Sequence, residues 1–235
     1  MASAADRSLH TDAAMTGSES NRRIEAVVFD VGETLINETR SWSEAAMAVG
    51  LPTFTVFGAL GSLIQRGDDH RKLWDMLGVE APPPPSPIET GDFYPDAIPA
   101  LHAIRDAGYR IGIAGNQPTG VVDQLHSLAL PVDFIASSAA WGVEKPSPEF
   151  FARVVRDAGV PAPCIAYVGD RIDNDVLPAA LAGMFVVFIV RGPWGYVQQH
   201  WPAAAQAHLR IETLSCLVEA LAERQSRGRG DPHGS

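Results

Sequence analysis

Several features that define whole classes of protein are scarce or missing in this chain of 235 residues. It has only two cysteines, Cys164 and Cys216, with neither metal-ligand spacing nor the spacing of a redox pair. The longest apolar run, Met184 to Val190, has the length of a buried strand and is too short for a membrane span. We therefore expect no disulfide framework, no cysteine-based zinc site and no membrane partner. So few cysteines also suit a cytoplasmic protein.

Basic residues are also few. Lysine and arginine total 18 against 28 aspartates and glutamates, so the formal net charge is −10. Nucleic acids and anionic membranes repel such a chain, so we expect neither as a partner. A phosphate group still fits a local site, because a metal ion, a lysine and helix N-termini attract it. The balance of charge leaves both a monomer and a homodimer open.

What the chain does have is 46% hydrophobic residues, enough for a globular core. Short apolar runs predict strands over residues 25–30, 109–114, 133–136, 164–168, 185–190 and, more weakly, 207–211. Helical patterns lie between them, over residues 96–107, 119–128, 148–158, 173–182 and 213–223. This alternation predicts an α/β fold with a parallel sheet covered by helices on both faces.

One segment interrupts the alternation. Residues 43–49, 57–66 and 69–77 have helical patterns with no strand between them, and a proline-rich connector follows at 81–87. We interpret residues 38–90 as a small helical cap inserted into a core formed by residues 23–37 and 91–223. Residues 1–22 lack the apolar centre of a signal peptide, and residues 224–235 are rich in glycine and arginine. We expect a disordered leader and a disordered tail there.

Candidate functional residues follow the predicted strands. Asp30 ends the first strand, Asp170 ends the fourth after a glycine, and Asp175 comes at the start of the next helix. Lys145 precedes a proline and therefore lies on a loop. Ligands of parallel sheets bind at the carboxyl ends of the strands, where these side chains gather. Carboxylates of this kind suit Mg²⁺, and an aspartate is able to attack phosphorus to form an aspartyl-phosphate.

Four segments together resemble the haloacid dehalogenase-like (HAD) superfamily of hydrolases. They are FDVGETL at 29–35, IGIAGN at 111–116, EKPSPEFF at 144–151 and VGDRIDND at 168–175, in family order over residues 24–223. The resemblance implies a Rossmann-like core with a cap after the first strand. It implies Asp30 as the nucleophile and Lys145 on the nucleophile and the substrate phosphate. It also implies Mg²⁺ held by Asp30, the Gly32 carbonyl and Asp170, with Asp175 in support.

Two positions depart from the family pattern. Phosphatases of the family usually carry a second aspartate, a general acid and base, where this chain has Gly32. Gly115 stands where a serine or threonine usually binds the phosphate. Glu33 is a candidate replacement for the missing acid, although its side chain is expected to leave the backbone in another direction. Asn116, Gln117, Arg191 and Trp194 also follow strand ends and are candidates for binding the substrate.

The leading hypothesis is therefore a Mg²⁺-dependent phosphatase of a small phosphorylated metabolite. The two departures leave open a catalytically degenerate domain that binds a ligand or partner, and a hydrolase of another carbon–X bond. A Rossmann dehydrogenase is disfavoured, because no GxGxxG motif follows the first strand.

Overall fold

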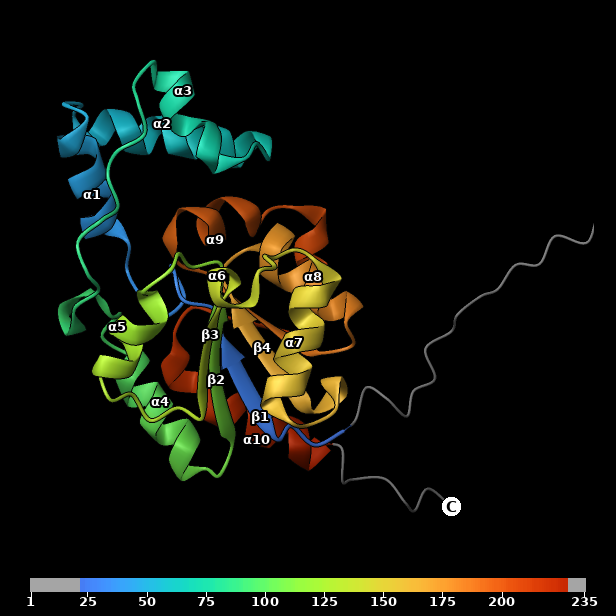
Figure 1. Cartoon of the computed structure of the whole chain (residues 1–235). Helices are drawn as coiled ribbons and strands as arrows, with labels where there is room; N and C mark the ends of the chain where they lie inside the picture. Colours follow the sequence, from blue (N-terminus) through green and yellow to red (C-terminus); the bar gives the residue numbers. More distant parts are fainter. Residues whose placement is uncertain (1–21, 228–235) are drawn as a thin grey trace, which may run out of the picture.

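A parallel sheet of six strands forms the centre of the computed structural model, which describes residues 22–227 (Figure 1). The strands are β1 (Ala26–Phe29), β2 (Arg110–Gly115), β3 (Phe134–Ser137), β4 (Ile165–Gly169), β5 (Phe185–Ile189) and β6 (Leu209–Ile211). Their order is β3-β2-β1-β4-β5-β6, and every neighbouring pair is parallel. The predicted α/β class is confirmed, and β1 lies between β2 and β4.

Helices of the core cover both faces of this sheet, and the first three helices of the chain lie beyond the carboxyl ends of its strands (Figure 1). The helices are α1 (Thr39–Ala48), α2 (Thr53–Arg66), α3 (Leu73–Leu77), α4 (Ala97–Asp106), α5 (Val121–Ser127), α6 (Ser138–Trp141), α7 (Pro148–Ala158), α8 (Leu177–Leu181), α9 (Gly192–Gln198) and α10 (Leu217–Arg227). Along β1, Val27 and Phe29 pack with residues of α4, α5 and α10, whereas Val28 packs with residues of α7 and α8. Successive side chains of a strand point to opposite faces, so β1 is buried on both.

The sequence at the ends of α7 explains where that helix begins and ends. The Ser147 hydroxyl accepts a hydrogen bond from the Glu149 N–H at 3.3 Å, and Pro148 occupies the first turn. The helix ends at Gly159, which adopts φ 68°, a conformation that glycine reaches without strain. These ends fix α7 immediately after the loop that carries Lys145, so they help to place that side chain.

Helices α1, α2 and α3 stand together beyond the carboxyl ends of the strands (Figure 1). They share a small apolar cluster that includes Ala46, Leu60 and Leu73, and Trp194 of α9 packs into the same cluster. Arg40 of α1 binds Asp92, where the chain returns to the core, through bonds of 2.7 and 2.5 Å. We continue to propose residues 38–90 as the cap.

The structure differs from the sequence-based expectations at the end of the chain. Residues 224–227, expected to belong to a disordered tail, form the last turn of α10. The Arg224 guanidinium lies over the Phe185 ring, and Gln225 donates a hydrogen bond to the Ile24 carbonyl at 3.3 Å. These contacts hold the turn against the sheet. Residues 1–21 and 228–235 lie outside the described residues, and so does most of the expected leader and tail.

Three further helices differ from the expected pattern, among them α6, a single turn that was not expected. The helix expected over 173–182 begins as a π-helical turn, Ile172–Val176, before α8. Helix α9 was not expected, because its sequence contains two glycines and a proline. Within residues 22–227, no single helix is long and apolar enough to cross a membrane. Only α1 and α2 taken together reach such a length and composition, and they bend by 114° between them.

Candidate active site

A cavity of about 1090 Å³ lies where the carboxyl ends of the central strands face the cap. Its walls include Asp30 after β1, Asn116 after β2 and Asp170 after β4. Lys145 and Trp194 also line it, and the cap contributes residues of α1. The candidate residues thus lie where a doubly wound sheet binds its ligands.

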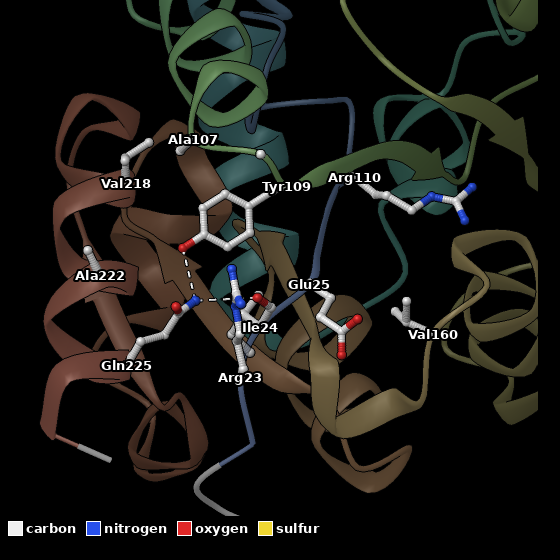
Figure 2. Close-up of a pocket in the computed structure, with 11 residues that line it drawn as sticks. Arg23, Ile24, Glu25, Ala107, Tyr109, Arg110, Val160, Val218, Ala222 and Gln225 are labelled. Atoms are coloured by element: carbon white, nitrogen blue, oxygen red, sulfur yellow. Dashed lines mark hydrogen bonds between the residues drawn. The ribbon is translucent and has the colours of Figure 1, made fainter. Parts of the chain in front are cut away.

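A second cavity, of about 690 Å³, lies at the opposite ends of β1 and β2. Figure 2 shows its lining, which includes Arg23, Glu25 and Arg110, with Gln225 donating a hydrogen bond to the Tyr109 hydroxyl at 3.1 Å. None of the candidate residues from the sequence lines this cavity. We therefore look for the chemistry at the carboxyl ends of the strands.

Lys145 joins two of the predicted aspartates. Its ammonium group donates to Asp30 Oδ1 and to Asp175 Oδ1, each at 2.6 Å, and only 3% of the residue is exposed. The second oxygen of Asp175 accepts from the Arg171 N–H at 3.0 Å. Such charge-assisted bonds fix the orientation of all three side chains. Lys145 binds one oxygen of Asp30, Oδ1.

Asp170 completes a cluster of three aspartates. Carboxylate oxygens of Asp30, Asp170 and Asp175 lie within 4.8 Å of one another. Asp170 Oδ2 is buried and has no hydrogen-bond partner among the described residues. A buried carboxylate oxygen without a partner costs free energy, and a cation would supply what it lacks. Oxygen ligands from carboxylates are those that Mg²⁺ takes, so the residues fit the ion that the sequence predicts.

The charges in this cluster shift its pKa values. Burial lowers the pKa of Lys145, but the carboxylates of Asp175 and Asp30 outweigh it and hold that pKa well above its usual value. Burial raises the pKa of Asp170 well above its usual value, and repulsion by Asp175 and Asp30 adds to the rise. Burial also raises the pKa of Asp175 to about 6, against the opposing charge of Lys145. One lysine therefore does not neutralise the three aspartates.

Asn116 holds the loop that carries Lys145. Its amide oxygen accepts from the Lys145 N–H at 2.8 Å, and its amide nitrogen donates to the Lys145 carbonyl at 3.0 Å. The Asn116 amide thus positions the Lys145 loop, and its predicted contact with substrate stays a prediction, because the residue also lines the cavity. Gln117 lines the cavity, and its predicted contact with substrate stays a prediction.

The two glycines that depart from the family pattern lie against carboxylates. A Cβ atom added to Gly115 would meet Asp30 Oδ1 at 2.6 Å, so no serine or threonine fits there beside this arrangement of Asp30. A Cβ atom added to Gly32 would meet Glu38 Oε1 at 2.5 Å. Real Cβ atoms do not approach other atoms so closely. Each glycine therefore leaves room for a carboxylate that comes from elsewhere.

Arg191 does not reach the cavity, contrary to its predicted role. Its guanidinium binds both oxygens of Asp96, at 3.1 and 2.6 Å, and donates to the Thr34 carbonyl at 3.2 Å. It also lies over the Tyr94 ring, 4.3 Å from the centroid. Arg191 thus ties the end of β5 to α4. Trp194, three residues later, does line the cavity.

Glu33 lines the cavity, and its carboxylate holds the turn after β1. The residue adopts φ 50°, in the left-handed region that side chains other than glycine rarely enter. One carboxylate oxygen accepts from the Glu38 N–H at 2.9 Å, and the other accepts from the Tyr94 hydroxyl. Burial raises the pKa of Glu33, while its hydrogen bond from Tyr94 opposes the rise.

Glu38 is a cavity residue that the sequence analysis did not identify. Trp42 Nε1 donates to its Oε2 at 3.3 Å, and its Oε1 lies against Gly32. Burial raises the pKa of Glu38 to about 7, and repulsion by Glu33 contributes. No motif marks this residue, because it lies beyond the turn that follows β1. Its place in the cavity wall and its close approach to Gly32 identify it in the structure.

Comparisons with known proteins agree on one family. A family model for haloacid dehalogenase-like hydrolases matches residues 85–183. The glyceraldehyde 3-phosphate phosphatase of Methanopyrus kandleri is 30% identical over 200 residues, which cover 73% of this chain and 86% of that protein. The protein of the same name from Methanocaldococcus jannaschii is 26% identical over 200 residues, covering 73% of this chain and 87% of that protein.

Solved structures share the fold. A HAD phosphatase from Thermococcus onnurineus superimposes with a TM-score of 0.56 at 22% identity, covering 84% of this chain and 98% of that chain. A 2-haloacid dehalogenase from Pseudomonas syringae superimposes with a TM-score of 0.54 at 20% identity, covering 85% and 99%. At these identities the likeness speaks for the fold alone, which serves both reactions.

Proposed function

The chain belongs to the haloacid dehalogenase-like hydrolase family, and from this membership we propose that it is a Mg²⁺-dependent phosphatase of a small phosphorylated metabolite. The observation that carries the proposal is the cluster at the sheet edge. Lys145 bridges Asp30 and Asp175, and the partnerless oxygen of Asp170 lies in the same cluster. This set supports attack by Asp30 on a phosphoryl group beside a bound cation.

In the proposed reaction, Asp30 Oδ2 attacks phosphorus, the bond from phosphorus to the leaving oxygen breaks, and Asp30 becomes an aspartyl-phosphate. Lys145 keeps Asp30 ionised and oriented, and its charge stabilises the added negative charge of the phosphoryl group. Water then hydrolyses the aspartyl-phosphate. Mg²⁺, held by Asp30, Asp170 and the Gly32 carbonyl with Asp175 in support, would offset charge on the phosphoryl oxygens.

The substrate class follows from the relatives and the cavity. Both archaeal relatives are glyceraldehyde 3-phosphate phosphatases. The cavity of about 1090 Å³ has room for a metabolite of that size between the aspartate cluster and the cap. We propose phosphorylated three-carbon to six-carbon metabolites as substrates, with glyceraldehyde 3-phosphate the first to assay.

The test is release of inorganic phosphate from a panel of such esters, with Mg²⁺ and after its removal by a chelator. We expect release with Mg²⁺ only, and no release by Asp30→Asn, which keeps the shape of the side chain and removes the attacking charge. A melting curve checks that the variant is folded. Release by Asp30→Asn at the wild-type rate would contradict the proposal.

The two alternatives give different results in the same experiment. A degenerate binding domain would stabilise on adding a phosphate ester and release no phosphate. A hydrolase of another carbon–X bond would leave phosphate esters intact and turn over a halogenated acid in an Asp30-dependent reaction. Either result would replace the phosphatase assignment.

A further inference from the structure

The leaving oxygen of an alkyl phosphate needs a proton as its bond to phosphorus breaks, because an alkoxide is a strong base. The proposed nucleophile Asp30 and its partner Lys145 do not supply one, since Lys145 bonds to Asp30 and Asp175. Another group that faces the cavity must therefore carry the proton. This step rests on the proposed phosphatase function.

Most carboxylates of the cavity are already engaged. Outside the aspartate cluster, every cavity carboxylate except that of Glu38 hydrogen-bonds to an arginine or to Tyr94. Glu38 accepts a bond from Trp42 on Oε2 alone, and its Oε1 has no hydrogen-bond partner among residues 22–227. Among the described residues, Glu38 is thus the cavity carboxylate outside the cluster that no arginine or tyrosine binds, and its Oε1 is open to a ligand.

The position of Glu38 Oε1 is close to that of a carboxylate on a side chain at position 32. It lies 2.5 Å from where the Cβ atom of a side chain at position 32 would lie. In an aspartate, a carboxylate oxygen lies about 2.4 Å from its own Cβ, as bond lengths dictate. Glu38 therefore brings a carboxylate from α1 to the space that an aspartate two residues after Asp30 would fill.

Two contacts hold Glu38 there. Glu33 accepts the Glu38 N–H at 2.9 Å and so fixes the backbone at the start of α1, and Trp42 fixes the carboxylate. The Glu38 side chain is thus oriented from both ends without being neutralised by a cation. Glu33 is a positioning residue in this arrangement.

We propose that Glu38 is the general acid and general base of this enzyme, in place of a carboxylate at position 32. In the first step Asp30 forms its bond to phosphorus, the ester oxygen leaves, and Glu38 gives its proton to that oxygen to form the alcohol. In the second step Glu38 takes a proton from water, whose oxygen attacks phosphorus, and the bond between Asp30 and phosphorus breaks. Both carboxyl groups then return to their initial states.

The test uses Glu38→Gln, which keeps the Trp42 contact and has no acidic proton. We expect turnover of alkyl phosphates to fall about 10²–10⁴-fold, the usual contribution of a general acid. With para-nitrophenyl phosphate, whose leaving group needs no proton, rapid-quench measurement should show a burst of one nitrophenol per active site and then slow turnover. A purely structural role for Glu38 would remove the burst as well.

Two variants complete the design. Glu44→Gln, on α1 but outside the cavity lining, is the matched control and should keep wild-type turnover. The second variant is the double substitution Glu38→Ala with Gly32→Asp, which should recover part of the turnover that Glu38→Ala loses. An aspartate fits there once Glu38 is shortened, because the three atoms nearest to a Cβ at Gly32 all belong to Glu38. The Gly32 backbone also lies outside the left-handed region, so it accepts a side chain. Recovery would show that the carboxylate is needed at that point in space.

The inference is overturned if Glu38→Gln turns over alkyl phosphates at the wild-type rate, or if it loses the burst while its melting curve is unchanged. The phosphatase proposal fails separately, if the wild type shows neither burst nor turnover. Suppose that the wild type shows an Asp30-dependent burst and that Glu38→Gln keeps both this burst and the wild-type turnover. Only the proposed role of Glu38 would then be refuted, and the phosphatase proposal would stand.

Discussion

Asp170 has the most unfavourable surroundings of the three clustered aspartates. Its Oδ2 is buried without a hydrogen-bond partner among the described residues, and burial and its neighbours raise its pKa. The carboxylates of Asp30 and Asp175 lie within 4.8 Å of it, and both already bind the same lysine, Lys145. Buried like charges destabilise a fold unless a cation or proton neutralises them. Mg²⁺ should therefore stabilise the folded chain as well as assist the reaction.

Replacing Asp170 by asparagine tests this. Wild-type protein should melt at a higher temperature with Mg²⁺, by the equivalent of about 2.7 kcal/mol when Mg²⁺ is at a hundred times its dissociation constant. Asp170→Asn should lose that rise, and without Mg²⁺ it should be no less stable than the wild type, because asparagine needs neither a cation nor a proton to be neutral at this buried position. Asp157→Asn, on α7 away from the cluster, is the control. An undiminished rise in Asp170→Asn would place the ion elsewhere.

Single residues also show what the sequence can predict. Asp30 and Lys145 meet as expected, because each stands at a recognisable point of the chain, a strand end or a loop before proline. Glu38 and Arg191 could not be predicted in this way. Glu38 is identified by its approach to Gly32, and Arg191 by its bonds to Asp96, 95 residues away in sequence. Contacts of this kind depend on how the elements pack.

At the scale of elements, α9 connects the cap with the core. Trp194 belongs to α9 but packs in the apolar cluster formed by α1, α2 and α3. Its ring meets His70 edge-on at 5.6 Å between centroids, and the Arg171 guanidinium lies 5.1 Å from its centre. One side chain thus contacts the cap and the segment after β4. Removing it should loosen the cap without disturbing the sheet.

Trp194→Ala should cost about 3–5 kcal/mol of stability, the usual loss for a buried tryptophan. We expect limited proteolysis to cut the variant in the proline-rich connector, residues 81–87, faster than it cuts the wild type. Tyr196→Ala changes an exposed aromatic residue on the same helix and should behave like the wild type. Equal melting temperatures and cleavage rates for Trp194→Ala and Tyr196→Ala would show that Trp194 does not hold the cap.

The elements differ in how well the sequence predicts them. The buried strands were placed to within one or two residues, because both faces of β1, β4 and β5 demand apolar side chains. Helix α9 was missed because Gly192, Pro193 and Gly195 disfavour a helix locally. Tertiary packing requires glycine at two of these positions, because a Cβ atom at Gly192 would meet Glu33, and one at Gly195 would meet the backbone of β5, within 3.2 Å.

At the scale of the whole molecule, a rigid sheet holds the nucleophile while the inserted helices bring the second carboxylate. Asp30, Asp170 and Lys145 come from the core, whereas Glu38 begins the cap segment. The chain lacks the second aspartate of the family pattern at Gly32 and the usual hydroxyl at Gly115. In our proposal Glu38 supplies the carboxylate that position 32 lacks.

The central claim is that Asp30 forms a covalent bond to phosphorus, and one measurement tests it directly. The protein is mixed with a phosphate ester and Mg²⁺, quenched with acid within one turnover, and its peptides are weighed by mass spectrometry. We predict that the peptide containing Asp30 gains the mass of one phosphoryl group and that Asp30→Asn gains none. When the ester is para-nitrophenyl phosphate, whose leaving group needs no proton, Glu38→Gln should carry more of this phosphoryl group than the wild type. Turnover without a phosphoryl group on Asp30, or with one on another residue, would contradict the account.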